Sequence, residues 1–355
     1  MAEPTRWVLH VDLDEFLAAV EVLRRPELAG LPVVVGGRGD PTERGVVATA
    51  SYAARELGVG SGMPLRTAAR RIPDAVFLPV DKPAYDEASE RVMAVLRSFP
   101  VRVEVLGWDE AFLGSDTDDP DTLAREVQRA VLERTDLHCS VGIGDNKLQA
   151  KIATGFGKPR GVGRLTSEQW DEVMGDRPVT ALWGIGSRTA RRLEGLGIRT
   201  VRDLAGTEVQ LLADTIGPTM GPWFRRLGRG VDSSPVDPAP WVPRGHGRET
   251  TFQVDLTDWV EVAEEARRLA AQVTEDVAAE GRPAVRVGVK VRYVPFETHQ
   301  RSLTLPAPTS DPAVIAEAAV ELVGRLDHER KVRLLGVRAE MAPPDDGNSA
   351  SEAVS

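Results

Sequence analysis

Two pairs of acidic residues stand where strand-like segments of the chain end or turn. In HVDLDEFLAAVE an apolar run ends on Asp12 and Asp14, and in GWDEAFL the residues Asp109 and Glu110 are adjacent. Neighbouring side chains on a regular strand point to opposite faces, so Asp109 and Glu110 can converge only at a turn. If the two segments are neighbouring strands, Asp12 joins this pair, and three carboxylates so close together repel one another unless cations neutralise them.

Such a group of carboxylates favours two-metal phosphoryl transfer. Mg²⁺ prefers hard oxygen ligands and keeps its remaining coordination sites for water and substrate phosphate. Two ions about 3.5–4 Å apart would activate an attacking hydroxyl and stabilise a leaving pyrophosphate. The alternative for each pair taken alone is structural. Asp14 would cap the following helix, which is the role we expect for it, and Asp109 and Glu110 would form a solvated hairpin tip.

The composition is that of a folded chain with several domains. The 355 residues predict two to four compact units, and 42% hydrophobic with 28% charged residues is typical of a globular protein. A single cysteine, Cys139, excludes an internal disulfide, and no cluster of Cys and His suggests zinc. No apolar run has membrane-spanning length and the N-terminus lacks the layout of a signal peptide, so we expect a cytoplasmic protein that does not bind membranes. The net charge of −10 argues only weakly against nucleic acid, because it does not show where the charges lie.

The first half of the chain predicts an α+β fold. Strands are expected in WVLHVD, VRVEVLGW, AFLG and LHCSVGIG, with helices through residues 82–99 and 121–135. The order β-α-β-β-α-β is the ferredoxin-like arrangement, with an insertion after the first strand.

The second half divides into a helical part and a mixed part. Residues 168–232 are helical with short loops, and they include the glycine turn of LWGIGSRTARRLEGLGI. The proline-rich stretch 233–243 is typical of an extended linker. Residues 244–341 interleave strands with two amphipathic helices, and the composition of residues 342–355 predicts a disordered tail.

Several of these patches, taken together and in order, resemble the Y-family DNA polymerases of the DinB or polymerase IV branch. The motifs that carry the resemblance are HVDLDEFLAAVE, VVATASYAARELGVGSGMP, GWDEAFL, SVGIGDNKLQAKIATGFGKPRGV and WGIGSRTARRLEGLGI, and it covers the chain from Trp7 to about Met341. It implies a multidomain right-hand polymerase with a ferredoxin-like palm (1–18 and 75–167), small fingers (19–74), a helical thumb with a helix–hairpin–helix (168–232), a linker (233–243) and an α/β little finger (244–341).

The resemblance also implies the site residues. The metal ligands would be the carboxylates of Asp12, Asp109 and Glu110 and the backbone carbonyl of Leu13, holding two Mg²⁺ or Mn²⁺ ions. The incoming triphosphate would be held by Tyr52, Arg55 and Lys158 and by the amides of Phe16 and Leu17, and the nascent base pair would lie near Val46 and Ala48. An arginine, a lysine and a helix N-terminus suit a polyphosphate, although Tyr52 could be a packing aromatic and Arg55 a solvated helix residue.

DNA contacts are expected in the thumb and in the little finger. Gly184 and Gly186 would let the backbone approach a DNA phosphate, the alternative being an ordinary interhelical turn. In the little finger, basic strand residues would follow the duplex, the alternative being an edge strand protected by charge: Arg286, Lys290, Arg292, Arg301 and Arg333.

The sequence departs from its relatives at three places. Leu17 stands where most relatives carry a tyrosine or phenylalanine that excludes ribose, so we predict relaxed sugar selection, the alternatives being that a neighbour fills the gap or that Leu17 packs in the core. Gly107 and Trp108 precede the acidic pair, and we expect Trp108 to face away from the metals and pack beneath the sheet. The tail has no bulky apolar anchor beyond Val354, so weak or absent binding of the tail to the sliding clamp, and distributive synthesis, are expected.

The predicted function is therefore template-directed DNA synthesis of the translesion, low-fidelity type. The expected partners are primer–template DNA, dNTPs and rNTPs, and we expect a monomer that acts on the bacterial nucleoid. Two other classes are a non-catalytic DNA-binding relative, which the complete carboxylate set disfavours, and a cyclase-like signalling enzyme on a similar palm. The second would not explain the helix–hairpin–helix or the little finger.

Overall fold

The computed structural model describes residues 5–344, which form two compact units. The first consists of residues 5–40, 47–63 and 67–240, and the second of residues 41–46, 64–66 and 241–344. No helix among residues 5–344 is long and apolar enough to cross a membrane.

The centre of the first unit is a five-stranded sheet in the order β5-β6-β1-β7-β8. Its strands are β1 (Trp7–Leu13), β5 (Arg102–Val105), β6 (Glu110–Ser115), β7 (Cys139–Gly144) and β8 (Val162–Arg164). All neighbours are antiparallel except β7 and β8. The first four strands in chain order have the ferredoxin-like arrangement, so the predicted α+β fold of the palm is confirmed.

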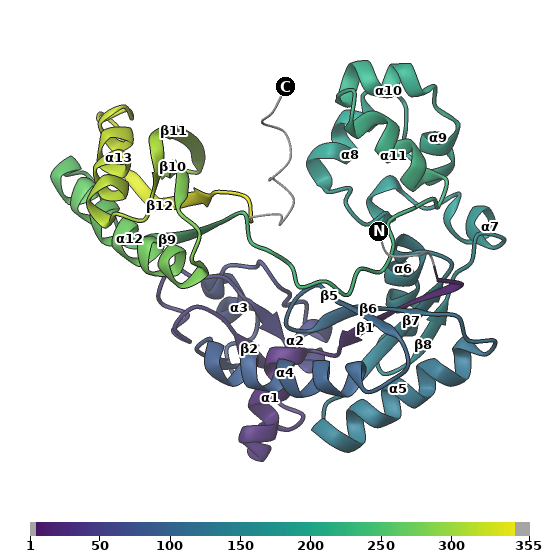
Figure 1. Cartoon of the computed structure of the whole chain (residues 1–355). Helices are drawn as coiled ribbons and strands as arrows, with labels where there is room; N and C mark the ends of the chain where they lie inside the picture. Colours follow the sequence, from purple (N-terminus) through teal and green to yellow (C-terminus); the bar gives the residue numbers. More distant parts are fainter. Residues whose placement is uncertain (1–4, 345–355) are drawn as a thin grey trace, which may run out of the picture. The chain divides into compact units, whose positions relative to one another are not determined.

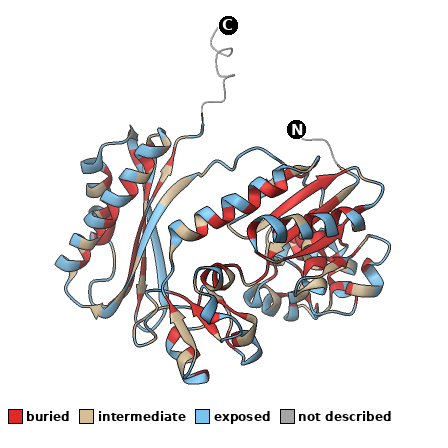
Figure 2. Ribbon diagram, turned by 90° about the horizontal axis from the view of Figure 1, so that it is seen from below, coloured by how far each residue is buried: buried red, intermediate tan, exposed pale blue. Residues whose placement is uncertain are grey.

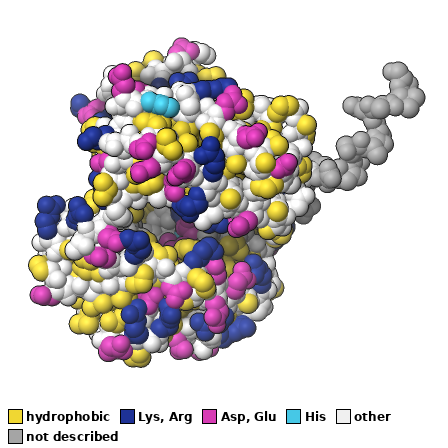
Figure 3. Space-filling model, turned by 90° about the vertical axis from the view of Figure 1, so that its left-hand side faces the viewer, with side chains coloured by type: hydrophobic (Ala, Val, Ile, Leu, Met, Phe, Trp, Pro, Cys, Tyr) yellow, Lys and Arg dark blue, Asp and Glu magenta, His cyan; other side chains and the backbone are white. Residues whose placement is uncertain are grey.

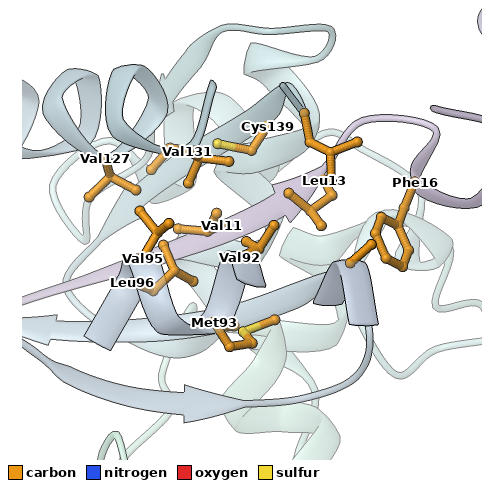
Figure 4. Close-up of a cluster of buried hydrophobic side chains, with 14 of the residues drawn as sticks. Val11, Leu13, Phe16, Val92, Met93, Val95, Leu96, Val127, Val131 and Cys139 are labelled. Atoms are coloured by element: carbon orange, nitrogen blue, oxygen red, sulfur yellow. The ribbon is translucent and has the colours of Figure 1, made fainter. Parts of the chain in front are cut away.

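Helices cover both faces of this sheet. Helices α4 (Lys82–Arg97) and α5 (Pro120–Thr135) lie on one face, and α6 (Lys147–Gly157) lies on the other (Figure 1). Side chains from β1, α4 and α5 interdigitate in the main core (Figure 4). Strand β1 is buried on both faces, which explains why it reads as a continuous apolar run rather than an alternating one.

Each of these three helices begins at a side chain that caps it. Asp119 accepts a hydrogen bond of 3.0 Å from the Thr122 amide at the start of α5, and Asn146 accepts one of 3.0 Å from the Gln149 amide at the start of α6. Asp81 does the same, more weakly, for α4 at 3.4 Å. Such caps satisfy amides that have no partner within the helix.

The insertion after β1 forms a small three-stranded sheet with short helices. Its elements are α1 (Phe16–Arg24), the 3₁₀ turn η1 (Pro26–Leu28), β2 (Val33–Val35), β3 (Thr49–Ala50), α2 (Tyr52–Glu56), α3 (Leu65–Arg71) and β4 (Val76–Leu78), with strand order β3-β2-β4. Strand β4 follows the boundary expected at residue 75, yet it pairs with β2 and belongs by its hydrogen bonds to this smaller sheet.

Residues 168–232 are helical, as predicted, and have a core of their own. Their elements are α7 (Trp170–Met174), η2 (Val179–Ala181), α8 (Ser187–Glu194), α9 (Val201–Gly206), α10 (Val209–Ile216) and α11 (Met220–Gly228). The following linker is held against the palm, since Val236 is buried beside Val8, Phe112 and Ala150.

The second unit is a four-stranded antiparallel sheet with two helices on one face. It contains β9 (Gly245–Leu256), α12 (Trp259–Glu280), β10 (Ala284–Tyr293), β11 (Glu297–Thr309), α13 (Pro312–Gly324) and β12 (Val332–Met341), in the strand order β11-β10-β12-β9. The helices turn their buried sides toward the sheet (Figure 2). Residues 41–46 belong to this unit through Arg44, which forms an ion pair with Asp255 and donates 2.9 Å to the Phe252 carbonyl.

The close packing of α6 on β7 leads to a stability prediction. A Cβ at Gly142 would lie 2.0 Å from the Ala150 carbonyl oxygen and 2.3 Å from the Thr154 amide nitrogen. We therefore expect Gly142→Ala to lower the free energy of unfolding by roughly 3 kcal/mol or more, because backbone atoms cannot move aside cheaply. Gly155→Ala is the matched control on α6, where a Cβ meets nothing within 4 Å, and it should stabilise by about 0.5–1 kcal/mol. Urea denaturation measures both, and equal effects would contradict the prediction.

Candidate active site

The sheet brings the three predicted carboxylates together at one edge. Asp12 near the end of β1 lies directly opposite Glu110, the first residue of β6. Asp109 immediately precedes β6, and its carbonyl accepts a hydrogen bond of 2.8 Å from the Leu13 amide. The turn expected before Glu110 is thus present, and it allows two residues adjacent in sequence to face the same site.

Two lysines neutralise this group only in part. Lys158, just beyond α6, forms an ion pair with Asp12, and Lys151 on α6 forms one with Glu110. Burial, followed by the charges of Asp12 and Glu110, raises the pKa of Asp109. The group therefore carries an excess of negative charge that a further cation would relieve.

His10, on β1, contacts the Glu110 carboxylate on the face of the sheet that α6 covers. Its Nε2 lies 3.2 Å from Glu110 Oε2, and its Nδ1 lies 2.8 Å from the Thr154 hydroxyl. The hydrogen bond from His10, followed by that from Lys151, lowers the pKa of Glu110 to about 2. Burial lowers the pKa of His10, so the ring favours its neutral form.

The donor chemistry fits a divalent cation. Three carboxylates beside an exposed backbone turn are the hard oxygen ligands that Mg²⁺ prefers. Across residues 5–344, no three His, Cys, Asp or Glu side chains are arranged to hold one ion as they stand. At this site the ammonium group of Lys151 holds one oxygen of Glu110, and that of Lys158 holds one oxygen of Asp12. An ion bound at these same oxygens would have to displace the lysines.

The expected capping role of Asp14 is wrong. The N-cap position of α1 is Glu15, with φ 46°, and no side chain caps this helix. Asp14 is instead buried and accepts hydrogen bonds from the Tyr52 hydroxyl at 2.6 Å, from the Ser140 hydroxyl at 2.9 Å and from the Arg160 amide at 3.0 Å. Such a network ties β1, α2 and β7 together, so Asp14 fixes the strand end that carries Asp12.

The residues expected to hold a triphosphate lie around this network. Tyr52 opens α2, and its backbone amide donates 2.5 Å to Glu15. Burial and the hydrogen bond to Asp14 raise the pKa of Tyr52, so its hydroxyl remains a donor. Arg55 is exposed and holds its guanidinium 5.1 Å from the centre of the Tyr52 ring, with Nε donating 2.8 Å to the Ala50 carbonyl.

Leu17 is buried in the main core, with 6% of its surface exposed. Its neighbour Phe16 is 2% exposed and packs edge-on against Tyr85. The alternative in which Leu17 packs in the core is thus realised in this conformation.

Val46 and Ala48, expected near a base pair, are exposed on the segment that leads into β3. Trp108 packs against α4, where its Nε1 donates 2.8 Å to Asp86 and its ring lies near Tyr85, so its expected place beneath the sheet is confirmed.

The two glycines of the thumb turn have different surroundings. Gly184 has φ 94°, and a Cβ there would lie 2.9 Å from the Trp223 ring. A Cβ at Gly186 would meet nothing within 4 Å. Gly184 is therefore required by the turn itself, whereas Gly186 leaves the backbone open to a phosphate.

The basic residues of the second unit do not all share one face. On β10, Arg286, Lys290 and Arg292 alternate with buried residues and lie on the face that the helices leave open. Arg301 on β11 is paired in register with the buried Val289, so its side chain starts from the opposite side of the sheet. Arg333 lies at an irregularity of β12 and stacks over Phe296 at 4.5 Å.

Sequence reasoning missed Arg338, Lys151 and His10. Arg338 on β12 is opposite Gly288 on the open face and lines a groove there together with Lys290. The alternation of RLLGVRAE could have found it. Basic and acidic side chains are interspersed on the face seen in Figure 3, so the acidic net charge does not make that surface uniformly negative.

Comparisons with known proteins cover almost the whole chain. The impB/mucB/samB family matches residues 11–155, the helix–hairpin–helix motif of the IMS family matches residues 167–198, and the C-terminal domain of the impB/mucB/samB family matches residues 243–351. DNA polymerase IV 2 of Mycobacterium tuberculosis (strain H37Rv) is 50% identical over 341 residues, covering 95% of this chain and 98% of the relative. DNA polymerase IV of Methanoculleus marisnigri is 42% identical over 353 residues, with 96% of each chain covered.

Two solved structures of Y-family or Dbh DNA polymerases are similar to this chain over nearly its whole length. The "Y-family DNA polymerase chimera Dbh-Dpo4(243-245)-Dbh" has a TM-score of 0.84 at 28% identity, covering 94% of this chain and 98% of that one. The "Insertion ternary complex of Dbh DNA polymerase" has a TM-score of 0.65 at 29% identity with the same coverage.

Proposed function

Because the chain belongs to the Y-family DNA polymerases, in the DNA polymerase IV branch, we propose that it extends a primer by two-metal phosphoryl transfer with relaxed selection of the sugar. Template-directed DNA synthesis of the translesion type is the activity of this family, and divalent metal ions support it. The proposal concerns which residues of this chain carry out the reaction and which nucleotides they accept.

The observation that carries the proposal is the pairing of Asp12 with Glu110 across β1 and β6, with Asp109 beside them. These carboxylates and the Leu13 carbonyl would hold two Mg²⁺ ions, with Mn²⁺ as a substitute. Bound there, the ions would supply Lewis-acid stabilisation of the attacking and leaving oxygens. The protein positions the carboxylates through the sheet register and through the Asp14 network.

The incoming nucleotide would lie between the palm and α2. Lys158 and Arg55 supply positive charge, the Tyr52 hydroxyl supplies a donor, and the amides of Phe16 and Leu17 open α1. A triphosphate would draw Lys158 away from Asp12, which would free the Asp12 carboxylate for metal binding. It would also accept the Tyr52 hydroxyl in place of Asp14, which Ser140 and the Arg160 amide would still hold.

The partners proposed are primer–template DNA and nucleoside triphosphates, since a Dbh polymerase related in structure is described as an insertion ternary complex. Gly186 and the basic residues on the open face of β10 would contact the DNA backbone. Such contacts do not read sequence, and binding through them weakens as salt rises. A monomeric, cytoplasmic enzyme remains our expectation.

Extension of a labelled primer–template tests the proposal. Wild-type protein should add both dNTPs and rNTPs in the presence of Mg²⁺, and chelation should stop both reactions. Binding of DNA without extension would favour the non-catalytic alternative. Use of dNTPs with refusal of rNTPs would leave the polymerase assignment intact and overturn the relaxed sugar selection.

A further prediction concerns processivity. Most of the expected tail, residues 345–355, lies outside the described residues, so the prediction rests on its lack of a bulky apolar anchor. Adding a bacterial sliding clamp to the extension reaction should change product length less than about twofold. Products that lengthen many-fold in the presence of the clamp, and shorten again on deletion of residues 342–355, would contradict it.

A further inference from the structure

Trp183 connects the glycine turn of the thumb to the carboxylate site. It directly precedes Gly184, is 44% exposed, and packs edge-on against the buried Phe112 at a centroid distance of 6.2 Å. Phe112 lies on β6, two residues after Glu110. A side chain of the hairpin is therefore held directly beside the strand that carries a candidate metal ligand.

Lys151 bridges the two sites. Its ammonium forms an ion pair with Glu110, lies 3.2 Å from His10 Nε2, and lies 5.2 Å from the centre of the Trp183 ring. A cation over an indole face is attracted by the ring electrons, and tryptophan is the best of the aromatic residues in this role. Trp183 thus helps to keep the ammonium on the carboxylate.

Lys147, one turn earlier on α6, shows that this arrangement is specific to Lys151. Its ammonium pairs with Glu104 at 2.5 Å and lies 5.5 Å from the Phe112 ring. The Glu104 carboxylate also accepts 2.7 Å from the amide of Asp237 in the linker. Lys147 therefore has a structural partner away from the site, whereas Lys151 is paired with a candidate metal ligand.

We propose that Trp183 is a positioning residue that keeps Lys151 on Glu110 and so weakens cation binding until the hairpin engages DNA. Lys151 and a divalent cation compete for the same carboxylate, so any contact that stabilises Lys151 there lowers the affinity for the cation. Binding of a DNA phosphate at Gly186 would shift Trp183, because the two residues belong to the same turn, Trp183–Gly184–Ile185–Gly186. The inference rests on the proposed function of the carboxylates and adds a link between DNA binding and metal binding.

The experiment measures Mn²⁺ affinity by calorimetry or by the loss of free Mn²⁺ signal in electron paramagnetic resonance. In DNA-free protein, Trp183→Leu should bind Mn²⁺ roughly two- to fivefold more tightly than wild type, the effect of losing one partly exposed cation–π contact. Trp183→Phe keeps an aromatic ring, so its Mn²⁺ affinity should lie between those of wild type and Trp183→Leu. When a primer–template whose primer ends in a dideoxynucleotide is bound, the Mn²⁺ affinities of wild type and Trp183→Leu should agree within about twofold.

A double-mutant cycle separates positioning from a general structural effect. Lys151→Met should itself tighten Mn²⁺ binding, and adding Trp183→Leu to it should change nothing further. Trp241→Leu is the matched control, since Trp241 is 78% exposed in the linker, and it should leave Mn²⁺ affinity unchanged. Three results would overturn the inference. Trp183→Leu could still change Mn²⁺ affinity in the Lys151→Met background, it could leave the Mn²⁺ affinity of DNA-free protein unchanged, or its effect on Mn²⁺ affinity could be as large with DNA as without it.

Failure of the underlying assignment is recognised separately. Only the Mn²⁺ binding that Asp109→Ala removes is counted. If Asp109→Ala binds Mn²⁺ as wild type does, the proposed metal site is wrong. If Asp109→Ala loses Mn²⁺ binding but Trp183→Leu does not change Mn²⁺ affinity, the proposed metal site is supported and the positioning role of Trp183 is excluded.

Discussion

Replacing Asp109 with alanine should lower kcat/KM for nucleotide addition by roughly a thousandfold or more, about 4 kcal/mol of transition-state stabilisation. Asp109 is the carboxylate of the three for which no lysine ion pair is found in residues 5–344. Its loss would leave a cation with two carboxylates that lysines already occupy. The effect should fall on kcat, because the ions stabilise charge that develops in the transition state.

The same substitution should leave the fold intact. Burial and two neighbouring carboxylates raise the pKa of Asp109, which means that folding disfavours its ionised form at neutral pH. Removing the charge should therefore maintain or increase the melting temperature while activity is lost. Single-turnover extension and thermal denaturation measure the two effects. Asp118→Ala, at a side chain that is 96% exposed, is the control and should change neither. A drop in melting temperature that accompanies the loss of activity would contradict this explanation.

The fold of the palm could be predicted because the hydrophobic pattern of each strand and helix is local in the sequence, and because the acidic motifs stand at the ends of strands. The residues that carry chemistry at strand ends, Asp12 and Glu110, could be placed once two antiparallel strands were assumed. Asp14 could not be placed correctly, because its partners are distant in the chain. Ser140 is 126 residues away and Tyr52 is 38 residues away. A prediction of helix capping takes account only of the first turn of the following helix. Asp14 instead forms hydrogen bonds with residues that are distant in the sequence.

Strand register and helix packing explain why the face of Arg301 and the contact of Lys151 were not predicted from the sequence. The alternation along β10 places Arg286, Lys290 and Arg292 on one open face of the sheet. The face of Arg301 depends on how β11 pairs with β10, and a shift of one residue moves every side chain to the other face. Lys151 was missed for a similar reason, since its contact with Glu110 depends on how α6 packs against β7 and β1.

Leu17→Phe should restore discrimination against ribonucleotides by roughly a hundredfold, about 3 kcal/mol in the ratio of kcat/KM for dNTP and rNTP. An isobutyl group can rotate away from a 2′-hydroxyl, whereas a ring at the start of α1 cannot. Incorporation of dNTPs should be nearly unchanged, so the ratio should change through the rNTP alone.

Core packing is the competing explanation for Leu17, and it makes a different prediction. Leu17 is only 6% exposed, so a larger side chain that had to remain in the core would cost about 1–3 kcal/mol of stability. It would then slow both nucleotides equally. Leu23→Phe, on the same helix at a side chain with 40% exposure, controls for a ring on α1 and should leave both the sugar ratio and the melting temperature unchanged. A large selective loss of rNTP use with a small change in melting temperature would assign Leu17 to the sugar. Equal losses with a lower melting temperature would assign it to the core.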